Sequence, residues 1–246
     1  MNEIIKALYA RKSVRAFEKK EIPADAKEAI IRAAMEAPTA GNQMLYTIVD
    51  VTDQAVKDKL AVTCDNQPFI AKAPLVLIFF ADHTRWCDTY KAAGLNPRRP
   101  GTGDLLLAVA DACIAAQNAA VAAESLGIGT CYIGDVIEQC ETVRELLNLP
   151  AHAVPAAMLV FGYPTESAGK REKPKRFDKK YIVFENKYKT LTPEEHKEMY
   201  EDMEKKSSRP GGDFEEKTKE FWLRKYESDF SLEMTRSADV YLKDWQ

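Results

Sequence analysis

Apolar residues along the chain alternate between a helical period and short continuous runs. Helical spacing predicts helices over residues 2–9, 23–37, 53–63 and 138–148. β-branched or continuous apolar runs predict strands over residues 46–51, 74–81, 130–134 and 154–162. Residues 82–103 are expected to form a helix and a surface loop, with further helices over 193–206, 214–227 and 236–244. This alternation indicates an α/β or α+β sandwich around one central sheet.

Two segments are apolar enough to form the core. Residues 74–81 are a continuous apolar run bounded by proline and Asp82, which is typical of a strand buried on both faces. Residues 104–126 are apolar nearly all round, so this long helix should be buried. Asp111, Gln117 and Glu124 interrupt it, which counts against a membrane span. Its many alanines favour close packing, either within one subunit or against a second one.

A basic segment follows the first helix. Arg11, Lys12 and Arg15 flank Ser13, and alternate residues of an extended segment point the same way. Two guanidinium groups and a hydroxyl at this spacing suit a grip on a phosphate. The alternative is an ordinary solvated basic loop.

Two further polar stretches lie next to predicted strands. Residues 38–43, Pro-Thr-Ala-Gly-Asn-Gln, form either an ordinary helix-to-strand turn or part of a ligand site. A second basic cluster, with Lys173, Lys175 and Arg176, follows the last buried strand, and a solvated loop is its default interpretation.

Composition excludes several classes of function. A formal net charge of -3 argues against nucleic acid as the main partner. Five cysteines without a Cys-x-x-Cys pair suit reduced thiols in the cytoplasm, and the three histidines lack metal-ligand spacing. The first residues lack a basic region before a long apolar run, so no signal peptide is expected. The glycines at 127 and 129 follow a helix and precede a strand, unlike a dinucleotide fingerprint.

Four motifs occur in an order and at a spacing that resemble the FMN-dependent nitroreductase family, in particular its branch of oxygen-insensitive nitroreductases and NADPH-flavin oxidoreductases. They are Arg11–Phe17, Ala37–Gln43, Gly127–Gly134, and Lys173–Arg176 followed by Val183–Tyr188. The resemblance implies an α+β fold with a mainly antiparallel central sheet flanked by helices. It also implies an FMN-binding domain over residues 1–190 and a C-terminal helical arm over 191–246.

The resemblance assigns roles to single residues. The FMN phosphate and ribityl chain would be held by Arg11, Lys12, Ser13 and Arg15, together with Lys173, Lys175 or Arg176. The family commonly has Lys-x-Arg at the second cluster, so which lysine contacts phosphate stays open. The flavin ring and ribityl would meet Thr39, Asn42, Gln67, Tyr132, Ile133 and Gly134. Weaker candidates for the substrate or NAD(P)H are Phe69, Arg209 and Arg236.

The resemblance also implies that this chain has the activity of the family. NAD(P)H would give hydride to flavin N5, and a nitroaromatic, quinone or free flavin would take the electrons in a second half-reaction. The resemblance also implies a homodimer with FMN sites at the interface. Composition and spacing add the expectation of a cytoplasmic chain without a nucleic-acid partner, a membrane partner or a metal. Alternatives are another reductive chemistry on the same fold (dehalogenation or ene reduction), a non-catalytic flavin sensor, and an interaction protein without flavin.

Overall fold

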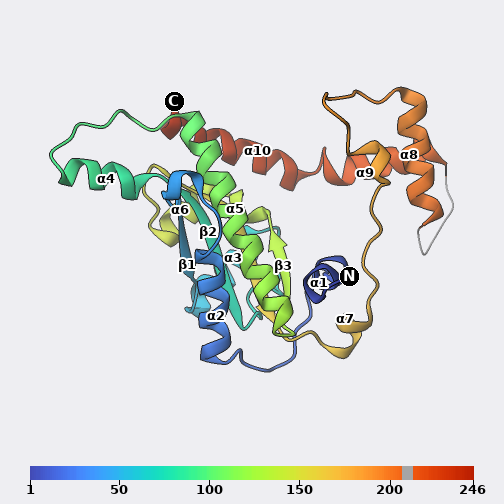
Figure 1. Ribbon diagram of the computed structural model, residues 1–246, viewed down its shortest axis with the longest axis horizontal. Coiled ribbons are helices and arrows are strands. Elements are labelled where there is room, and N and C mark those ends of the chain that lie inside the picture. Colours follow the sequence, from blue (N-terminus) through green and yellow to red (C-terminus); the bar gives the residue numbers. More distant parts are fainter. Residues whose placement is uncertain (207–212) are drawn as a thin grey trace. The chain divides into compact units, whose positions relative to one another are not determined.

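The computed structural model describes residues 1–206 and 213–246 and consists of two units (Figure 1). The first unit comprises residues 1–171 and 233–246, and the second comprises residues 172–232.

A four-stranded antiparallel sheet forms the centre of the first unit. Its strands are β1 (Tyr46–Asp50), β2 (Leu75–Asp82), β3 (Gly129–Ile133) and β4 (Ala153–Gly162), in the spatial order β1-β2-β4-β3. Every neighbouring pair is antiparallel, with Leu77 opposite Leu159 and Thr130 opposite Phe161. This confirms the expected antiparallel sheet.

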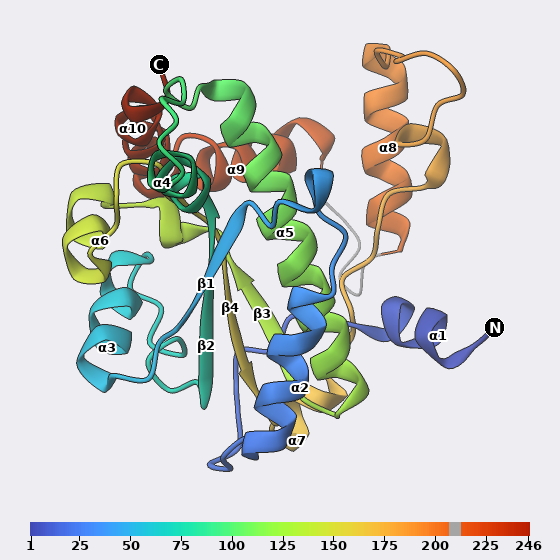
Figure 2. The same ribbon diagram turned by 60° about the vertical axis from the view of Figure 1, so that its left-hand side comes forward.

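Helices cover both faces of the sheet (Figure 2). Helices α2 (Ala24–Met35) and α5 (Thr102–Ser125) lie on one face, and α3 (Gln54–Thr63) and α6 (Cys140–Leu147) lie on the other. Strand β2 contributes to both cores: Leu77 and Phe79 pack on the α2–α5 side, and Ile78 and Phe80 pack on the α3 side. The expected strand with two buried faces is therefore confirmed.

Helix α5 is the core helix that its composition predicts. Seven of its alanines are buried, and it packs on α2, β2 and β4. By length and composition alone this helix is also long enough to cross a membrane. Within the first unit, however, α5 packs as a core helix. Its small alanine side chains let the sheet and α2 approach its backbone closely.

The remaining helices are α1 (Glu3–Ala10), α4 (Thr84–Ala92), α7 (Glu166–Lys170), α8 (Pro193–Lys205), α9 (Phe214–Lys225) and α10 (Asp229–Leu242). Helix α7 lies between β4 and the second basic cluster, where no helix is predicted, and α10 begins at Asp229 instead of residue 236. Tyr241 and Trp245 near the C-terminus are fully buried beside Leu105 and Val154. The last residues therefore belong to the first unit, and the expected domain boundary at residue 190 stays a prediction.

Candidate functional site

The basic segment lies along the edge of the sheet. Ser13 forms a parallel bridge with Thr130 of β3, and the Val14 amide donates to the Thr130 carbonyl at 2.9 Å. Further along, the Thr165 amide after β4 donates to the Ala16 carbonyl at 3.1 Å. Alternation along this extended segment buries Val14 and leaves Ser13 and Arg15 exposed, as the sequence predicts.

Two glycines allow this close approach. A Cβ at Gly129 would lie 2.6 Å from Cγ2 of Val14, and a Cβ at Gly162 would lie 2.6 Å from Cδ1 of Phe17. Both glycines are on β-strands, so their role is to leave room for the basic segment. The segment is thereby fixed to β3 and β4 at both ends.

Arg11 carries an unpartnered buried donor. Its Nη2 donates to Oγ1 of Thr130 at 3.4 Å, and its guanidinium lies over the Tyr132 ring, 5.6 Å from the centroid. Its Nε is buried and, within the part of the chain that the structure describes, has no hydrogen-bond partner. A buried guanidinium N–H without an acceptor fits an anionic ligand such as a phosphate.

Arg15 and Lys12 differ in their surroundings. The Arg15 guanidinium lies over the Phe69 ring, 5.9 Å from its centroid, and beside the Cys131 thiol. Burial raises the pKa of Cys131, and the Arg15 charge opposes this increase. By contrast, Lys12 donates to the carbonyls of Gly169 and Arg171, each at 2.5 Å, so it fixes the chain around α7.

The loop after α3 meets the end of β3 through Gln67. Its amide nitrogen donates to Oδ2 of Asp135 and to the Cys64 carbonyl, each at 2.9 Å. Both of these partners are acceptors, so the amide orientation is determined and its oxygen remains available to accept. These contacts form one connected surface, which we call the rim. It contains Gln67, Phe69, Arg15 and Asp135 and continues to Arg11 and Tyr132.

The predicted residues at the end of β3 have different exposures. The Tyr132 hydroxyl donates to Oε1 of Gln117 at 3.2 Å, and burial raises the pKa of Tyr132 to about 12. Ile133 is buried in the core on the α3 side, whereas Gly134 is exposed and follows the strand directly. Among these residues Gly134 presents its backbone to solvent.

The turn after α2 is organised by Asp111, whose only signal in the sequence is that it interrupts an apolar helix. This carboxylate is buried on α5 and accepts from the Thr39 hydroxyl, the Ala40 amide at 2.9 Å and the Leu45 amide at 3.2 Å. The Thr39 hydroxyl in turn accepts from the Met44 amide at 2.9 Å. Asn42 is exposed at the tip of this turn with φ of 58°.

The second basic cluster lies in the second unit. Arg176 donates to the Pro174 carbonyl at 3.0 Å, and Lys175 and Arg176 are exposed. Whether this cluster, with Lys173, meets the phosphate stays a prediction. Arg209 lies outside the described residues.

Arg236 connects α10 to α6. Its guanidinium binds both oxygens of Glu141 and both of Glu233, at 2.8 to 2.9 Å. These ion pairs engage most of its donors and favour a structural role over a coenzyme contact.

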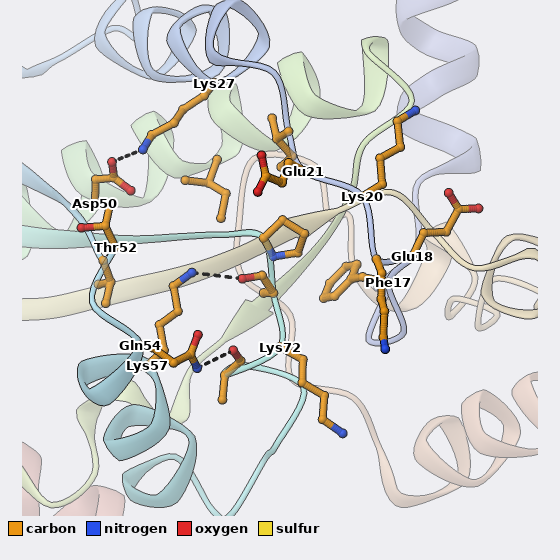
Figure 3. Close-up of a pocket in the computed structure, with 17 residues that line it drawn as sticks. Phe17, Glu18, Lys20, Glu21, Lys27, Asp50, Thr52, Gln54, Lys57 and Lys72 are labelled. Atoms are coloured by element: carbon orange, nitrogen blue, oxygen red, sulfur yellow. Dashed lines mark hydrogen bonds and ion pairs between the residues drawn. The ribbon is translucent and has the colours of Figure 1, made fainter.

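A separate pocket of about 660 Å³ lies beside the segment that follows Phe17 (Figure 3). It is lined by several lysines, but Lys27 pairs with Asp50, and the buried Lys57 donates to the Ala73 carbonyl at 3.2 Å. None of the residues predicted for the flavin lines it. The rim around Arg11 is therefore the better candidate for a phosphate-bearing ligand.

The model of the Nitroreductase family matches residues 8–163, which include the basic segment, Gln67 and the end of β3. This chain belongs to the nitroreductase family. It is 32% identical to an FMN reductase (NADPH) of Bacillus subtilis over 194 residues, 78% of this chain and 77% of that protein. It is 34% identical to an oxygen-insensitive NADPH nitroreductase of Salmonella typhimurium over 191 residues, 78% and 77% of the two chains.

Solved structures extend the similarity to the whole nitroreductase chain. The structure of NfrA1 nitroreductase from B. subtilis matches with a TM-score of 0.82 at 25% identity, covering 98% of both chains. The NADPH:FMN oxidoreductase from Vibrio harveyi complexed with NAD+ matches with a TM-score of 0.81 at 25% identity, again over 98% of both chains. The C-terminal helices are thus included in the shared fold.

Proposed function

We propose that this nitroreductase-family chain is an FMN-dependent NAD(P)H oxidoreductase acting on small-molecule acceptors: nitroaromatics, quinones or free flavins. The single observation that carries the proposal is the unpartnered buried Nε of Arg11, in a rim that also contains Arg15 and Gln67. When bound, FMN supplies the redox chemistry, taking hydride from the nicotinamide and passing electrons to the acceptor. Relatives named FMN reductase (NADPH) and NADPH-flavin oxidoreductase support this assignment.

The chain's own residues then bind and orient the cofactor. Arg11, Ser13 and Arg15 hold the phosphate end, because guanidinium and hydroxyl donors suit a phosphate and the Nε of Arg11 is buried without a hydrogen-bond partner among the described residues. Gln67 offers its amide oxygen to an N–H of the ring, and Gly134 offers its backbone. Lys12 contributes by holding the chain after β4 in place, and its direct contact with FMN stays a prediction.

We further propose a cytoplasmic homodimer that completes each site with the partner's turn around Thr39 and Asn42. Asp111 holds this turn rigidly, and Asn42 lies exposed at its tip. The five cysteines are all free thiols, which suits a reducing compartment. Size-exclusion chromatography with light scattering tests the assembly: a monomer that still retains FMN would exclude interface sites.

An absorbance spectrum tests the function. The purified protein is expected to show flavin bands that bleach without oxygen on addition of NADPH or NADH and return with an acceptor. A colourless chain that takes up no added FMN would refute the proposal. Bands that fail to bleach with either coenzyme would indicate a flavin-binding protein without this activity, and an acceptor panel separates nitro or quinone reduction from dehalogenation and ene reduction.

A further inference from the structure

A buried pair of carboxyl groups lies at the end of β3. Glu138 is only 3% exposed, and its Oε1 has no hydrogen-bond partner within the described residues. Its carboxyl group lies within hydrogen-bonding reach of Asp135, and its amide donates to the Asp135 carbonyl at 3.0 Å. Asp135 in turn accepts from the Gln67 amide.

The surroundings of Glu138 favour a protonated carboxyl group. Carboxylates act on it from three elements: Asp135 in the turn after β3, Asp65 in the loop after α3 and Glu233 on helix α10. Of these, Glu233 is paired with Arg236 of the same helix. The buried Cys64 thiol lies in the same neighbourhood. Burial, followed by the charge of Asp135, raises the pKa of Glu138 to about 8.

A single shared proton also explains the hydrogen bonding. A protonated Glu138 donates from one oxygen to Asp135, and its other oxygen becomes a neutral carbonyl. Leaving a neutral carbonyl without a partner costs less free energy than leaving a charged oxygen without one.

The backbone holds this arrangement in a fixed geometry. Gln139, directly after Glu138, has φ of 48°, and Asp65 and Asn66, directly before Gln67, have φ of 56° and 51°. A left-handed backbone conformation is uncommon at a residue such as glutamine. It persists where the surrounding structure holds the residue in place. The two loops that carry the pair and Gln67 are therefore held in defined positions.

We propose that Glu138 and Asp135 share one proton and act as a positioning pair for the flavin. Asp135, held by the Glu138 proton, fixes the Gln67 amide with its oxygen free to accept from the flavin ring. The proton also keeps this end of the site at one negative charge instead of two. This inference rests on the proposed flavin site.

The pair makes FMN binding depend on pH. Loss of the shared proton places a second negative charge beside Gln67, which disfavours an anionic ligand and frees Glu138 from Asp135. The dissociation constant for FMN is therefore expected to rise by about tenfold between pH 7 and pH 9, because one linked proton changes it by at most tenfold per pH unit.

The experiment measures FMN dissociation constants by fluorescence quenching from pH 6.5 to 9 for the wild type, Glu138→Gln and Glu145→Gln. Glutamine has the shape of the protonated acid, and Glu145 is an exposed control on α6. Riboflavin serves as a second probe, because it lacks the phosphate, which titrates near pH 6.

Glu138→Gln is expected to bind both probes like the wild type at pH 7 and to lose the rise at pH 9, while Glu145→Gln keeps it. A purely structural role would change the dissociation constant by the same factor at every pH, and that result would overturn the inference. FMN binding with no pH dependence beyond that of the phosphate would overturn it too, leaving the proposed function intact. A wild-type chain that binds neither probe would overturn both.

Discussion

Replacing Glu138 by glutamine should make the unfolding free energy less sensitive to pH. An unfolded glutamate releases its proton near pH 4.5, whereas the folded protein holds it up to about pH 8. Between these values the unfolded chain binds fewer protons than the folded chain, so raising the pH favours unfolding. The contribution of Glu138 to the unfolding free energy of the wild type should therefore fall with rising pH across this window. It should be constant below and above it.

The size of the effect follows from the same interval. One pKa unit corresponds to about 1.4 kcal/mol, so the interval from 4.5 to about 8 sets an upper limit of about 5 kcal/mol. Relaxation around a charged Glu138 reduces this value, and we expect about 2 kcal/mol. Glu138→Gln should thus have nearly wild-type stability at pH 5 and exceed it by about 2 kcal/mol at pH 9.

Urea unfolding followed by circular dichroism at pH 5, 6.5, 8 and 9 measures this difference. The flavin is removed beforehand, because a ligand that binds only the folded state would add its own pH dependence. Glu145→Gln, on the exposed face of α6, should parallel the wild type throughout. If the profile of Glu138→Gln also runs parallel to the wild type, Glu138 does not carry the proton in the folded protein.

Three other substitutions test the site. Arg11→Ala should raise the FMN dissociation constant by about tenfold or more, since hydrogen bonds to charged groups contribute about 1.5–3 kcal/mol; equal flavin retention in Arg11→Ala and in the exposed control Lys59→Ala would remove Arg11 from the site. Gly129→Ala should destabilise the fold by about 1–3 kcal/mol in urea through its contact with Val14, and wild-type stability would contradict the packing. Asp111→Ala should cost about 3 kcal/mol by leaving the buried Leu45 amide and the half-buried Ala40 amide without an acceptor; an unchanged urea midpoint would show that the turn folds without it.

The elements that the sequence predicts best are those whose pattern is local. The run from Leu75 to Ala81 is continuously apolar and every residue of β2 is buried, so no polar position interrupts the pattern before Asp82. The same holds for α5, whose alanines identify a core helix by themselves. The basic segment was also found where it was expected, because alternation along an extended chain needs no information from elsewhere.

Other parts of the site depend on residues far apart in the chain. Asp111 is a lone acid in an apolar helix, and its partners Ala40 and Leu45 lie 71 and 66 positions away. The helical pattern over residues 138–148 puts Glu138 at the start of a helix, whereas α6 begins at Cys140 and the Glu138 carboxyl group is buried before it. Helix α10 begins at Asp229, earlier than its mixed polar pattern suggests, and its end is anchored in the core by Tyr241 and Trp245.

The distribution of charge along the rim is the one that the proposed flavin site requires. Arg11 and Arg15 lie along β3 before its end, where a phosphate needs donors and positive charge. Asp135 and Glu138 lie beyond the end of the same strand, where two full negative charges would repel an electron-rich ring. One shared proton halves that charge while Asp135 still orients Gln67. An acidic pair can therefore lie beside a reducible ligand in this fold, provided that its proton is retained.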